Sequence, residues 1–553
     1  MCVFLEKVQH CGTVSGSIGQ KRNDFSTGKD MAMSGVFINS DAWNFWTDSK
    51  CIETDPAKAI RDDVDFYADA GGVEAVFYNM NFSRSFLNTK VGTPIWKDCT
   101  FDADGNLRLR GFPLKKADSD NYGPMVRRAK FMHENMPDFM QYRYDYCHKK
   151  GIEMWHSMRM NDVHHSELGG EFKPQHCDLW LDHKEMLRAW YRHTWRGYWI
   201  DNGFDYGRRD VYEYHLNLAR EYLLDYESDG IELDWMRAMP VFKPGYDELN
   251  TEILTNFVRD VKAAALEAEK KWGHRVRIAA RTPYQPQEAY ALGMDVGTWA
   301  AEGLIDVLIP SPNGLCMEQD AQLKLWRAIA PNLILAPCVD YVVVSNRENF
   351  SRQAFTKEID CGMISTYYAQ GADTIYFYNH FPRHEHDTEP RIREIFPAAA
   401  DREKAASLPR RHVITAHDSC VEGLYNAPCF PAKIWEKCSD GGVRIHAGER
   451  TAGRKGVILI GSSVPLNVNV LLNTAYCDPV TDFDLPQNFK KGGNGTQHGS
   501  FWVVSGNVPE IFWTCVEIPQ QALHDGWNNV ELYNHDSHII ESKEILWMEL
   551  NLA

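Results

Sequence analysis

The sequence predicts an α/β fold, a (β/α)8 TIM barrel followed by a C-terminal β-sandwich domain. Eight segments with strand character recur through residues 31–404, and helical segments separate them. This alternation is typical of a closed parallel barrel. No glycine-rich phosphate-binding turn follows the first strand, which weakens the alternative of a doubly wound sheet. From residue 405 to residue 553 the chain has short strand-like segments separated by Gly, Asn, Asp and Pro, which favours a separate sandwich.

Composition restricts the class of protein. The 553 residues carry a formal net charge of −17, and 44% of them are hydrophobic, as in an ordinary globular protein with a large core. The acidity argues against nucleic acid or an anionic membrane as a partner, because both require a basic surface. No apolar run is long enough for a membrane span, and the N-terminus lacks a signal-peptide pattern. We therefore expect a cytoplasmic protein, or a secreted one if an export signal has been removed; a homo-oligomer is one option that the sequence leaves open.

The fourteen cysteines are scattered, with no CxxC pair and no spacing typical of zinc ligands. In a chain of this size such a distribution favours free thiols over a disulfide framework. We expect no metal and no cofactor.

The first repeat is expected near the N-terminus. Residues 1–30 show no strong period and are expected to be an N-terminal extension. Strands are predicted at Gly35–Asn39 and Gly72–Asn79, with a helix at Asp55–Ala70 between them.

Residues 84–125 interrupt this rhythm, because they are rich in Gly, Pro, Asp and Asn, with a turn at Asp102–Gly105. Insertions after barrel strands lie on the catalytic face, so we expect a substrate-covering loop or a small hairpin here. One helix is predicted over Tyr122–Lys150, followed by a third strand at Gly151–His156.

The later elements continue the alternation. The predicted elements are a helix at Arg209–Asp225, a strand within Tyr226–Pro240, a helix at Asp247–Trp272, a strand at Val276–Ala280, a helix at Val296–Gly303, and strands at Ile305–Pro310, Leu333–Pro337 and Thr374–Tyr378. In the C-terminal part, strands are predicted at Gly456–Ile460, Asn467–Leu472, Phe501–Ser505, Asn528–Tyr533 and Ile545–Leu552.

The stretch Tyr226–Pro240 (YESDGIELDWMRAMP) is the strongest functional signal. In a strand with the sequence IELDW, the three apolar residues face one side, and Glu232 and Asp234 face the other. Two such residues lie roughly 7 Å apart along the backbone, within the separations that paired-acid hydrolases use. The alternative is an ordinary ion pair with Arg237 at the end of the strand.

Polar side chains also follow the other predicted strands, where a barrel presents its ligand-binding groups. The expected substrate-binding residues are Asn39, Asp41, Tyr78, Asn79, His156, Arg159, Asn161, Asp162, His164, Arg237, Arg281, Tyr284, Ser311, Asn313, Asn379 and His380. Asp340, after the seventh strand, is a further candidate for a catalytic carboxylate. For any one of these positions, a solvated loop residue is the alternative.

The region Gly151–Pro310 resembles the glycosyl-hydrolase-like barrel proteins called family-10-like, which are related to the chitinase-like clan. The matching parts are GIEMWHSMRMND, YESDGIELDWMRAMP, VRIAARTPY and TWAAEGLIDVLIPSP. The resemblance implies a TIM barrel that acts on glycosidic bonds. Glu232 and Asp234 stand where the chitinase-like signature usually has two Asp residues, and Met236 stands where those enzymes carry their acid. The proton donor is then Glu232, Asp234 or a residue on another strand, such as Asp340.

We therefore expect a glycoside hydrolase that cleaves an oligo- or polysaccharide with Glu232, Asp234 and Asp340 as its catalytic carboxylates. Three arginines, Arg159, Arg237 and Arg281, together with His164 and His165, favour an anionic sugar, a uronate or a sulfate ester. The alternative is that these arginines balance the carboxylates of the site itself.

Two other functions remain open. One is a metal-dependent barrel hydrolase, which His380, His384, His386 and Asp387 suggest, although the first strand lacks a His-x-His pair. The other is a glycan-binding protein without activity, in keeping with Met236.

Overall fold

The structure is a computed structural model. It describes residues 35–162, 164, 173–192, 198–312, 317–340, 342–344, 352–354, 356–380, 389–415, 417, 421, 430, 432–434, 442–485, 511–535 and 543–553. The N-terminal extension expected at residues 1–30 and the strand expected at Phe501–Ser505 lie outside these ranges.

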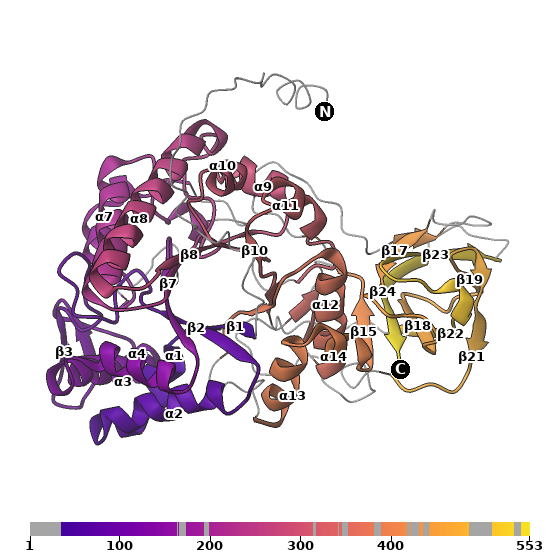
Figure 1. Ribbon diagram of the computed structural model, residues 1–553, viewed down its shortest axis with the longest axis horizontal. Coiled ribbons are helices and arrows are strands. Elements are labelled where there is room, and N and C mark those ends of the chain that lie inside the picture. Colours follow the sequence, from indigo (N-terminus) through magenta and orange to yellow (C-terminus); the bar gives the residue numbers. More distant parts are fainter. Residues whose placement is uncertain are drawn as a thin grey trace, which may run out of the picture.

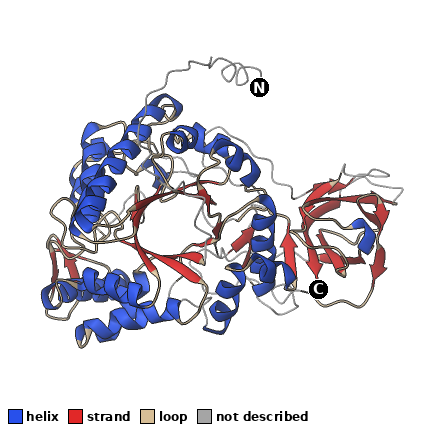
Figure 2. Cartoon of the chain, viewed as in Figure 1, coloured by secondary structure: helices blue, strands red, loops and turns tan. Residues whose placement is uncertain are grey.

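A curled parallel sheet occupies the centre of the larger part of the molecule, and helices surround it (Figure 1). The strand order is β10-β9-β8-β7-β6-β2-β1-β14-β11. The strands are β1 (Val36–Ser40), β2 (Val73–Asn79), β6 (Glu153–Arg159), β7 (Gly230–Asp234), β8 (Arg277–Pro283), β9 (Val307–Ser311), β10 (Ile334–Leu335), β11 (Cys338–Val339) and β14 (Tyr376–Phe377). The fold is thus a TIM-like α/β barrel, and Figure 2 shows its strands as a ring.

The seventh predicted strand differs from expectation, because it is divided at Ala336 and Pro337. β10 pairs with β9 and β11 pairs with β14, so the ladder is not continuous around the ring. The intervening residues still form hydrogen bonds to both sides: the Ala336 N–H donates to the carbonyl of Leu308 (2.9 Å), and the carbonyl of Pro337 accepts from the N–H of Tyr376 (3.1 Å). Proline has no N–H to donate, which accounts for a break in the ladder here.

The helices outside the sheet follow the sequence pattern. They are α1 (Trp43–Asp48), α2 (Pro56–Ala68), α3 (Lys116–Asn135), α4 (Phe139–Lys149), α5 (Asp178–Asp182), α6 (Tyr198–Asp201), α7 (Arg209–Asp225), α8 (Thr251–Trp272), α9 (Pro286–Ala291), α10 (Val296–Ala301), α11 (Leu323–Ile329), α12 (Lys357–Gln370), α13 (Glu389–Ala399) and α14 (Arg402–Ser407). The helix predicted over Tyr122–Lys150 is in fact two helices. Proline disfavours the helical conformation in the residue before it, and Met136, which precedes Pro137, has a φ of −147° and a ψ of 69°. The helix predicted at Arg209–Asp225 is confirmed as α7.

Local sequence explains several helix ends. Asp55 caps α2 by accepting a hydrogen bond from the backbone N–H of Lys58 (2.9 Å), and Pro56 takes the first helical position. Gly273 ends α8 with a positive φ of 81°, which glycine adopts without a steric penalty.

The insertion near residues 84–125 contains the expected hairpin. The strands β3 (Cys99–Phe101), β4 (Leu107–Leu109) and β5 (Phe112–Pro113) form a small antiparallel sheet. The side chain of Asp102 accepts the backbone N–H groups of Asp104 (3.0 Å) and Asn106 (2.8 Å), which shapes the turn. Figure 1 shows this sheet at the outer edge of the barrel, so the hairpin does not cover the centre of the ring.

The C-terminal part consists of two antiparallel sheets. One has the order β15-β24-β18-β22-β21, with β16 on β24, and the other has the order β17-β23-β19-β20. The strands are β15 (Arg410–Val413), β16 (Ala432–Ile434), β17 (Val443–His446), β18 (Gly456–Ser462), β19 (Val468–Leu472), β20 (Ala475–Tyr476), β21 (Asp478–Val480), β22 (Phe512–Glu517), β23 (Trp527–Asn534) and β24 (Lys543–Leu552). Their apolar side chains form a cluster of their own, which includes Ile445, Ile458, Val470 and Leu532. A short hairpin of β12 (Val342–Val344) and β13 (Arg352–Ala354) belongs to neither sheet.

The helix α12 joins the barrel to this β-rich region. Figure 1 shows β15 between α12 and β24. Gly362 of α12 lies so close to the carbonyl of Arg411 on β15 that no side chain fits there. All but three of the fourteen residues of α12 are buried, because both of its sides are covered.

The expectations about a membrane span and about the cysteines can be compared with the described residues. None of the helices in this part of the chain is long and apolar enough to cross a membrane. The eight cysteines in it that are free thiols are Cys51, Cys99, Cys147, Cys177, Cys338, Cys361, Cys477 and Cys515.

Candidate active site

The carboxyl ends of the parallel strands meet at one mouth of the ring, and alternate side chains of each strand point into it. An aromatic layer comes first, in which the Phe77 ring centroid lies 4.7 Å from that of Trp155 and 5.5 Å from that of Tyr376. Further along the strands the inward positions become polar. These positions include Asn39 on β1, Asn79 on β2, Ser157 on β6 and Glu232 on β7. The interior therefore changes from apolar to polar toward the mouth.

Glu232 is fully buried, and polar groups surround its carboxyl. The Tyr376 hydroxyl donates to Oε1 (2.5 Å), and the Asn39 amide donates to Oε2 (3.4 Å) and to the Ser157 hydroxyl (3.2 Å). Burial and the neighbouring carboxylate of Asp234 raise the pKa of Glu232 to about 7. Glu232 therefore holds a proton in a large fraction of molecules near neutral pH.

Asp234 lies one layer closer to the mouth, in register with Arg281 on β8. The Arg281 guanidinium forms an ion pair with Oδ1 of Asp234 (3.0 Å), and its Nε donates to the Ser311 hydroxyl (2.9 Å). The second oxygen of Asp234, Oδ2, is buried and has no hydrogen-bond partner. A buried acceptor left without a donor costs free energy, so this atom marks a place that a ligand can complete.

Arg159, on β6, belongs to a second ionic network at the same mouth. Its guanidinium binds Asp41 (3.0 Å) after β1 and Asp162 (3.1 Å) in its own loop. His164 also hydrogen-bonds Asp162 (2.8 Å). Although burial alone raises it, the pKa of Asp162 lies well below its usual range because of the charges of His164 and Arg159.

Asp340 follows β11 and is fully buried. Burial, with a smaller contribution from Asp340, raises the pKa of Cys338 to about 12, which places the Asp340 charge near an inward-facing residue. Asp340 therefore contributes a third carboxylate to the interior.

Three expected site residues lie elsewhere. Tyr78 and His156 occupy the outward positions of their strands; the Arg143 guanidinium lies 4.4 Å from the Tyr78 ring centroid, and burial lowers the pKa of His156 to about 3. Tyr284 lies beyond the end of β8, and its hydroxyl donates to the carbonyl of Cys338 from outside the sheet (2.7 Å). All three belong to the apolar layer between strands and helices, or border it, because they are one residue out of phase with the inward face.

Two further residues have structural contacts. The Asn161 side chain accepts the N–H of Phe204 (2.7 Å) and donates to its carbonyl (3.3 Å). The His380 ring packs on Phe377 and Phe396, with ring centroids 5.2 Å and 6.1 Å away. Neither side chain points to the carboxylates of β7.

Four further residues were expected in the site: Asn79, Asn379, Asn313 and His165. Asn79 donates to the carbonyl of Asp41 (3.1 Å) and so shapes the rim. Asn379 lies two residues beyond β14 and has a φ of 58°, a left-handed conformation that Asn tolerates. Asn313 and His165 lie outside the described residues.

Sequence reasoning missed three residues that line the interior, Ser157, Tyr376 and Tyr378. Ser157 and Tyr376 stand at inward positions of their strands, and Tyr378 continues the alternation one residue beyond β14. The alternation in TIYFY could have identified Tyr376 and Tyr378, because they flank the outward Phe377.

The metal-dependent alternative has limited support in the described ranges. Within them, no group of three or more His, Cys, Asp and Glu side chains is arranged to hold a metal ion. His384, His386 and Asp387 lie outside those ranges.

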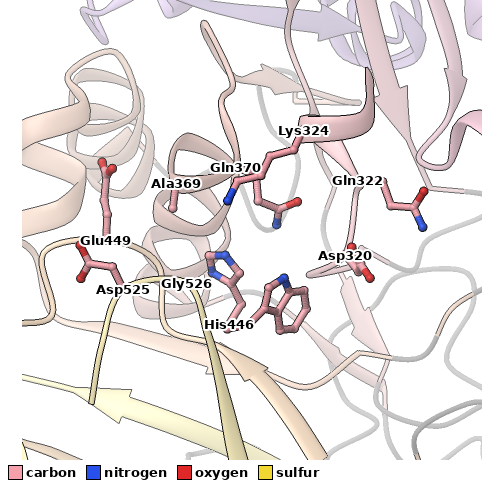
Figure 3. Close-up of a pocket in the computed structure, with 10 residues that line it drawn as sticks. Asp320, Gln322, Lys324, Ala369, Gln370, His446, Glu449, Asp525 and Gly526 are labelled. Atoms are coloured by element: carbon pink, nitrogen blue, oxygen red, sulfur yellow. The ribbon is translucent and has the colours of Figure 1, made fainter. Parts of the chain in front are cut away.

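A separate pocket of about 380 Å³ lies where the barrel meets the β-rich region (Figure 3). Its lining residues are Asp320, Gln322, Lys324, Ala369, Gln370, His446, Glu449, Asp525, Gly526 and Trp527. Its carboxylates already have partners: Asp320 bonds Arg444 (3.4 Å), Glu449 bonds Arg402 (2.8 Å) and Asp525 bonds Thr451 (2.7 Å). We therefore place the candidate chemistry in the barrel mouth and not in this pocket.

Comparison with known proteins gives the following picture. No protein-family model matches the sequence, and no curated protein matches it. Among solved structures, the chain is similar to a cycloisomaltooligosaccharide glucanotransferase from Paenibacillus sp. in complex with cycloisomaltoheptaose (10% identity, TM-score 0.32, covering 94% of this chain and 58% of that one). It is also similar to a GH36 alpha-galactosidase variant from Geobacillus stearothermophilus in complex with raffinose (11% identity, TM-score 0.33, 94% and 55%) and to an alpha-amylase from Lactobacillus plantarum (11% identity, TM-score 0.37, 79% and 93%).

These structural neighbours are carbohydrate-acting enzymes, and the chain spans little more than half the length of the first two. At this level of similarity they carry no argument about the activity of this chain. The resemblance to the family-10-like and chitinase-like proteins stays a prediction.

Proposed function

We propose that this protein is a glycoside hydrolase whose reacting carboxylates are Glu232 and Asp234. One observation supports this more than any other: on the inward face of β7, Asp234 has an ion pair and an unsatisfied oxygen, while Glu232 beside it has a pKa raised to about 7. Environments that separate the protonation of two neighbouring carboxyls are typical of acid and base assignments.

Hydrolysis of a glycosidic bond needs a protonated acid at the leaving oxygen and a second carboxylate that acts as nucleophile or base. In the proposal, Asp234 acts on the sugar carbon or on the attacking water, and Glu232 supplies the proton. Two residues apart on one strand, their Cα atoms are roughly 7 Å apart. A carboxyl separation of that size would favour inversion of configuration, and a shorter one would favour retention.

Asp340 is the rival for the acid. The strand β10 pairs with β9, and the chain continues from β10 into β11. Asp340 therefore faces the mouth from a different side than Glu232 and Asp234, which lie on β7. Substrates with different leaving groups distinguish the two candidates, because the loss of a general acid slows the reaction of substrates with poor leaving groups most.

The test measures sugar release from a panel of glycans by the full chain and by the variants Asp234→Asn, Glu232→Gln and Asp340→Asn. We expect Asp234→Asn to lower kcat/KM by about 10³-fold or more, and Glu232→Gln by about 10²- to 10⁴-fold on natural glycans. On aryl glycosides with good leaving groups, the Glu232→Gln loss should be much smaller. If that pattern appears in Asp340→Asn instead, Asp340 is the acid.

A matched control is Glu221→Gln on α7. Glu221 is buried and accepts a hydrogen bond from the N–H of Lys90 (2.6 Å), so the same chemical change occurs outside the ring. It should leave the rate unchanged. Wild-type rates in a well-folded Asp234→Asn variant would refute the proposal, and glycan binding without turnover in the wild type would identify a binding protein.

A further inference from the structure

We infer that the substrate carries an anionic group, a carboxylate or a sulfate ester, which binds between Arg237 and Tyr378. This inference rests on the proposed function and deepens it by naming the class of sugar. Three arginines, Arg159, Arg237 and Arg281, lie at the barrel mouth.

Two of the three arginines are already neutralised by the protein. Arg159 binds both Asp41 (3.0 Å) and Asp162 (3.1 Å), and its side chain is 2% exposed. Arg281 binds Asp234 (3.0 Å). Neither guanidinium has a charge left over for a ligand.

Arg237, three residues beyond β7, differs from both. Among the described residues it has no ion pair and no side-chain hydrogen bond, and its Nε is buried without a partner. Its backbone is nevertheless anchored, because its carbonyl accepts the N–H of Asn161 (2.6 Å) and the next N–H, that of Ala238, donates to the carbonyl of Asn161 (2.8 Å). The guanidinium is thus carried by a fixed segment at the rim.

The carboxylate of Asp162 does not satisfy Arg237. The charge of Arg237 contributes, after the charges of His164 and Arg159, to the low pKa of Asp162. The Asp162 carboxylate forms ion pairs with Arg159 (3.1 Å) and His164 (2.8 Å), and it forms none with Arg237.

Tyr378, the residue directly after β14, provides a second donor at the same place. The Arg281 guanidinium lies 3.6 Å from its ring centroid and that of Arg237 lies 5.8 Å away. The side chain is 2% exposed, and its hydroxyl has no hydrogen-bond partner. The Tyr378 hydroxyl is therefore a buried donor without a partner, on a ring that lies near two cations, and it can donate to an anion bound there.

An anion satisfies both groups at once. A guanidinium binds a carboxylate or a sulfate through two N–H groups, and such charge-assisted hydrogen bonds are stronger than neutral ones. Buried polar groups without partners are rare in folded proteins, and a ligand is one explanation for them. The unsatisfied oxygen of Asp234 lies on the same inward face, so one ligand can place its charged group at Arg237 and its reacting bond at Asp234.

The test compares binding of oligosaccharide pairs that differ in charge alone, measured by calorimetry. The pairs are oligogalacturonate with its methyl ester, and a sulfated oligosaccharide with its desulfated form. The full-length Glu232→Gln variant is used to prevent turnover, because it leaves the ion pair of Arg281 and Asp234 intact. We expect the charged member of one pair to bind at least about 10-fold more tightly, and the pair that shows this preference distinguishes carboxylate from sulfate.

Adding Arg237→Ala should abolish the preference while the neutral member keeps its affinity within about twofold. Arg237→Lys should retain part of the preference, and Tyr378→Phe should reduce it with little effect on folding. Arg209→Ala removes an exposed arginine of α7 and should change nothing.

Two results would overturn the inference: no pair shows a preference for charge, or Arg237→Ala weakens both members equally, which would make Arg237 a balance for the site's own carboxylates. Failure of the proposed function has a different signature. In that case the wild type shows the charge preference but releases no sugar, whereas turnover of neutral glycans alone would refute the anionic class and leave the hydrolase assignment standing.

Discussion

The barrel mouth and the junction with the β-rich region both bury charged side chains, but they satisfy them differently. At the junction, the His417 ring lies between Glu318 (2.5 Å from Nδ1) and Glu288 (2.7 Å from Nε2), with Gln285 also near Nδ1 (3.1 Å). Although burial lowers it, the hydrogen bonds to the two carboxylates raise the pKa of His417 to about 10. Both ring nitrogens of His417 thus have carboxylate partners, which is typical of a contact that stabilises the fold.

In the mouth, atoms of the same kinds are left without partners. They are Oδ1 of Asn39, Oδ2 of Asp234, Nε of Arg237 and the hydroxyl of Tyr378. The carboxyl of Glu232 is meanwhile kept beside another carboxylate, which disfavours its charge. Removing the charge of His417 should therefore destabilise the junction. Removing the charge of Glu232 should stabilise the mouth.

The largest effect is expected at the junction. His417→Ala leaves Glu288 and Glu318 buried without their shared cation, so the free energy of unfolding should fall by about 3 kcal/mol at pH 7. The pKa of His417 is raised from 6.5 to about 10, so its contribution is complete below pH 6.5 and is lost as the pH rises toward 10. Urea unfolding at several pH values should show the two proteins converging above pH 7. An unchanged midpoint at pH 7 would mean that this contact does not support the junction.

A somewhat smaller effect of opposite sign is expected in the mouth. Folded Glu232, with a pKa of about 7, binds its proton more tightly than the unfolded chain does, so wild-type stability falls as the pH rises from 4.5 to about 7. Glu232→Gln lacks this loss and should be more stable than the wild type at pH 8 by on the order of 2 to 3 kcal/mol, and similar at pH 4. Thermal unfolding across this range measures the difference, and parallel curves would contradict it.

The next change sharpens the role of Glu232 in the rate. Tyr376→Phe removes the donor to Oε1, which by itself lowers the pKa of Glu232. The pKa should therefore rise, and the alkaline limb of kcat/KM should move up by roughly one unit. Tyr67→Phe is the control, because Tyr67 donates to the carbonyl of His380 outside the ring (3.1 Å). An identical pH profile in Tyr376→Phe would remove Glu232 from the role of acid.

The smallest effect sets the baseline. Asp120→Asn breaks an exposed pair with Lys116 on α3 (2.5 Å) and should change stability by less than about 0.5 kcal/mol, with unchanged activity. Chemical unfolding and the glycan assay measure both. A loss comparable to that of His417→Ala would show that buried and exposed pairs are not as different as the comparison assumes.

The sequence alone predicted the parts that depend on local periodicity. The helix at Arg209–Asp225 and the strand that places Glu232 and Asp234 on one face follow from periods of 3.6 and 2 residues, which act within a few positions of the chain. Period also separates Asp234 from Tyr78 and His156, since the latter two occupy outward positions.

What could not be predicted depends on partners distant in sequence. Arg281 meets Asp234 across 47 positions, and Arg159 meets Asp41 across 118. Which of three arginines stays unpaired is decided by these meetings and not by any local pattern. The division of the seventh strand at Pro337 likewise depends on neighbours supplied by β9 and β14.

The tight fit of Gly362 under the Arg411 carbonyl has a practical consequence for anyone who shortens the chain. A fragment that stops near residue 404, where the amino-acid composition changes, would expose the face of α12 that carries Gly362, Ser365 and Thr366. The Ser365 and Thr366 hydroxyls would lose their partners at Glu449 and His412, so a boundary placed there is expected to destabilise the barrel fragment.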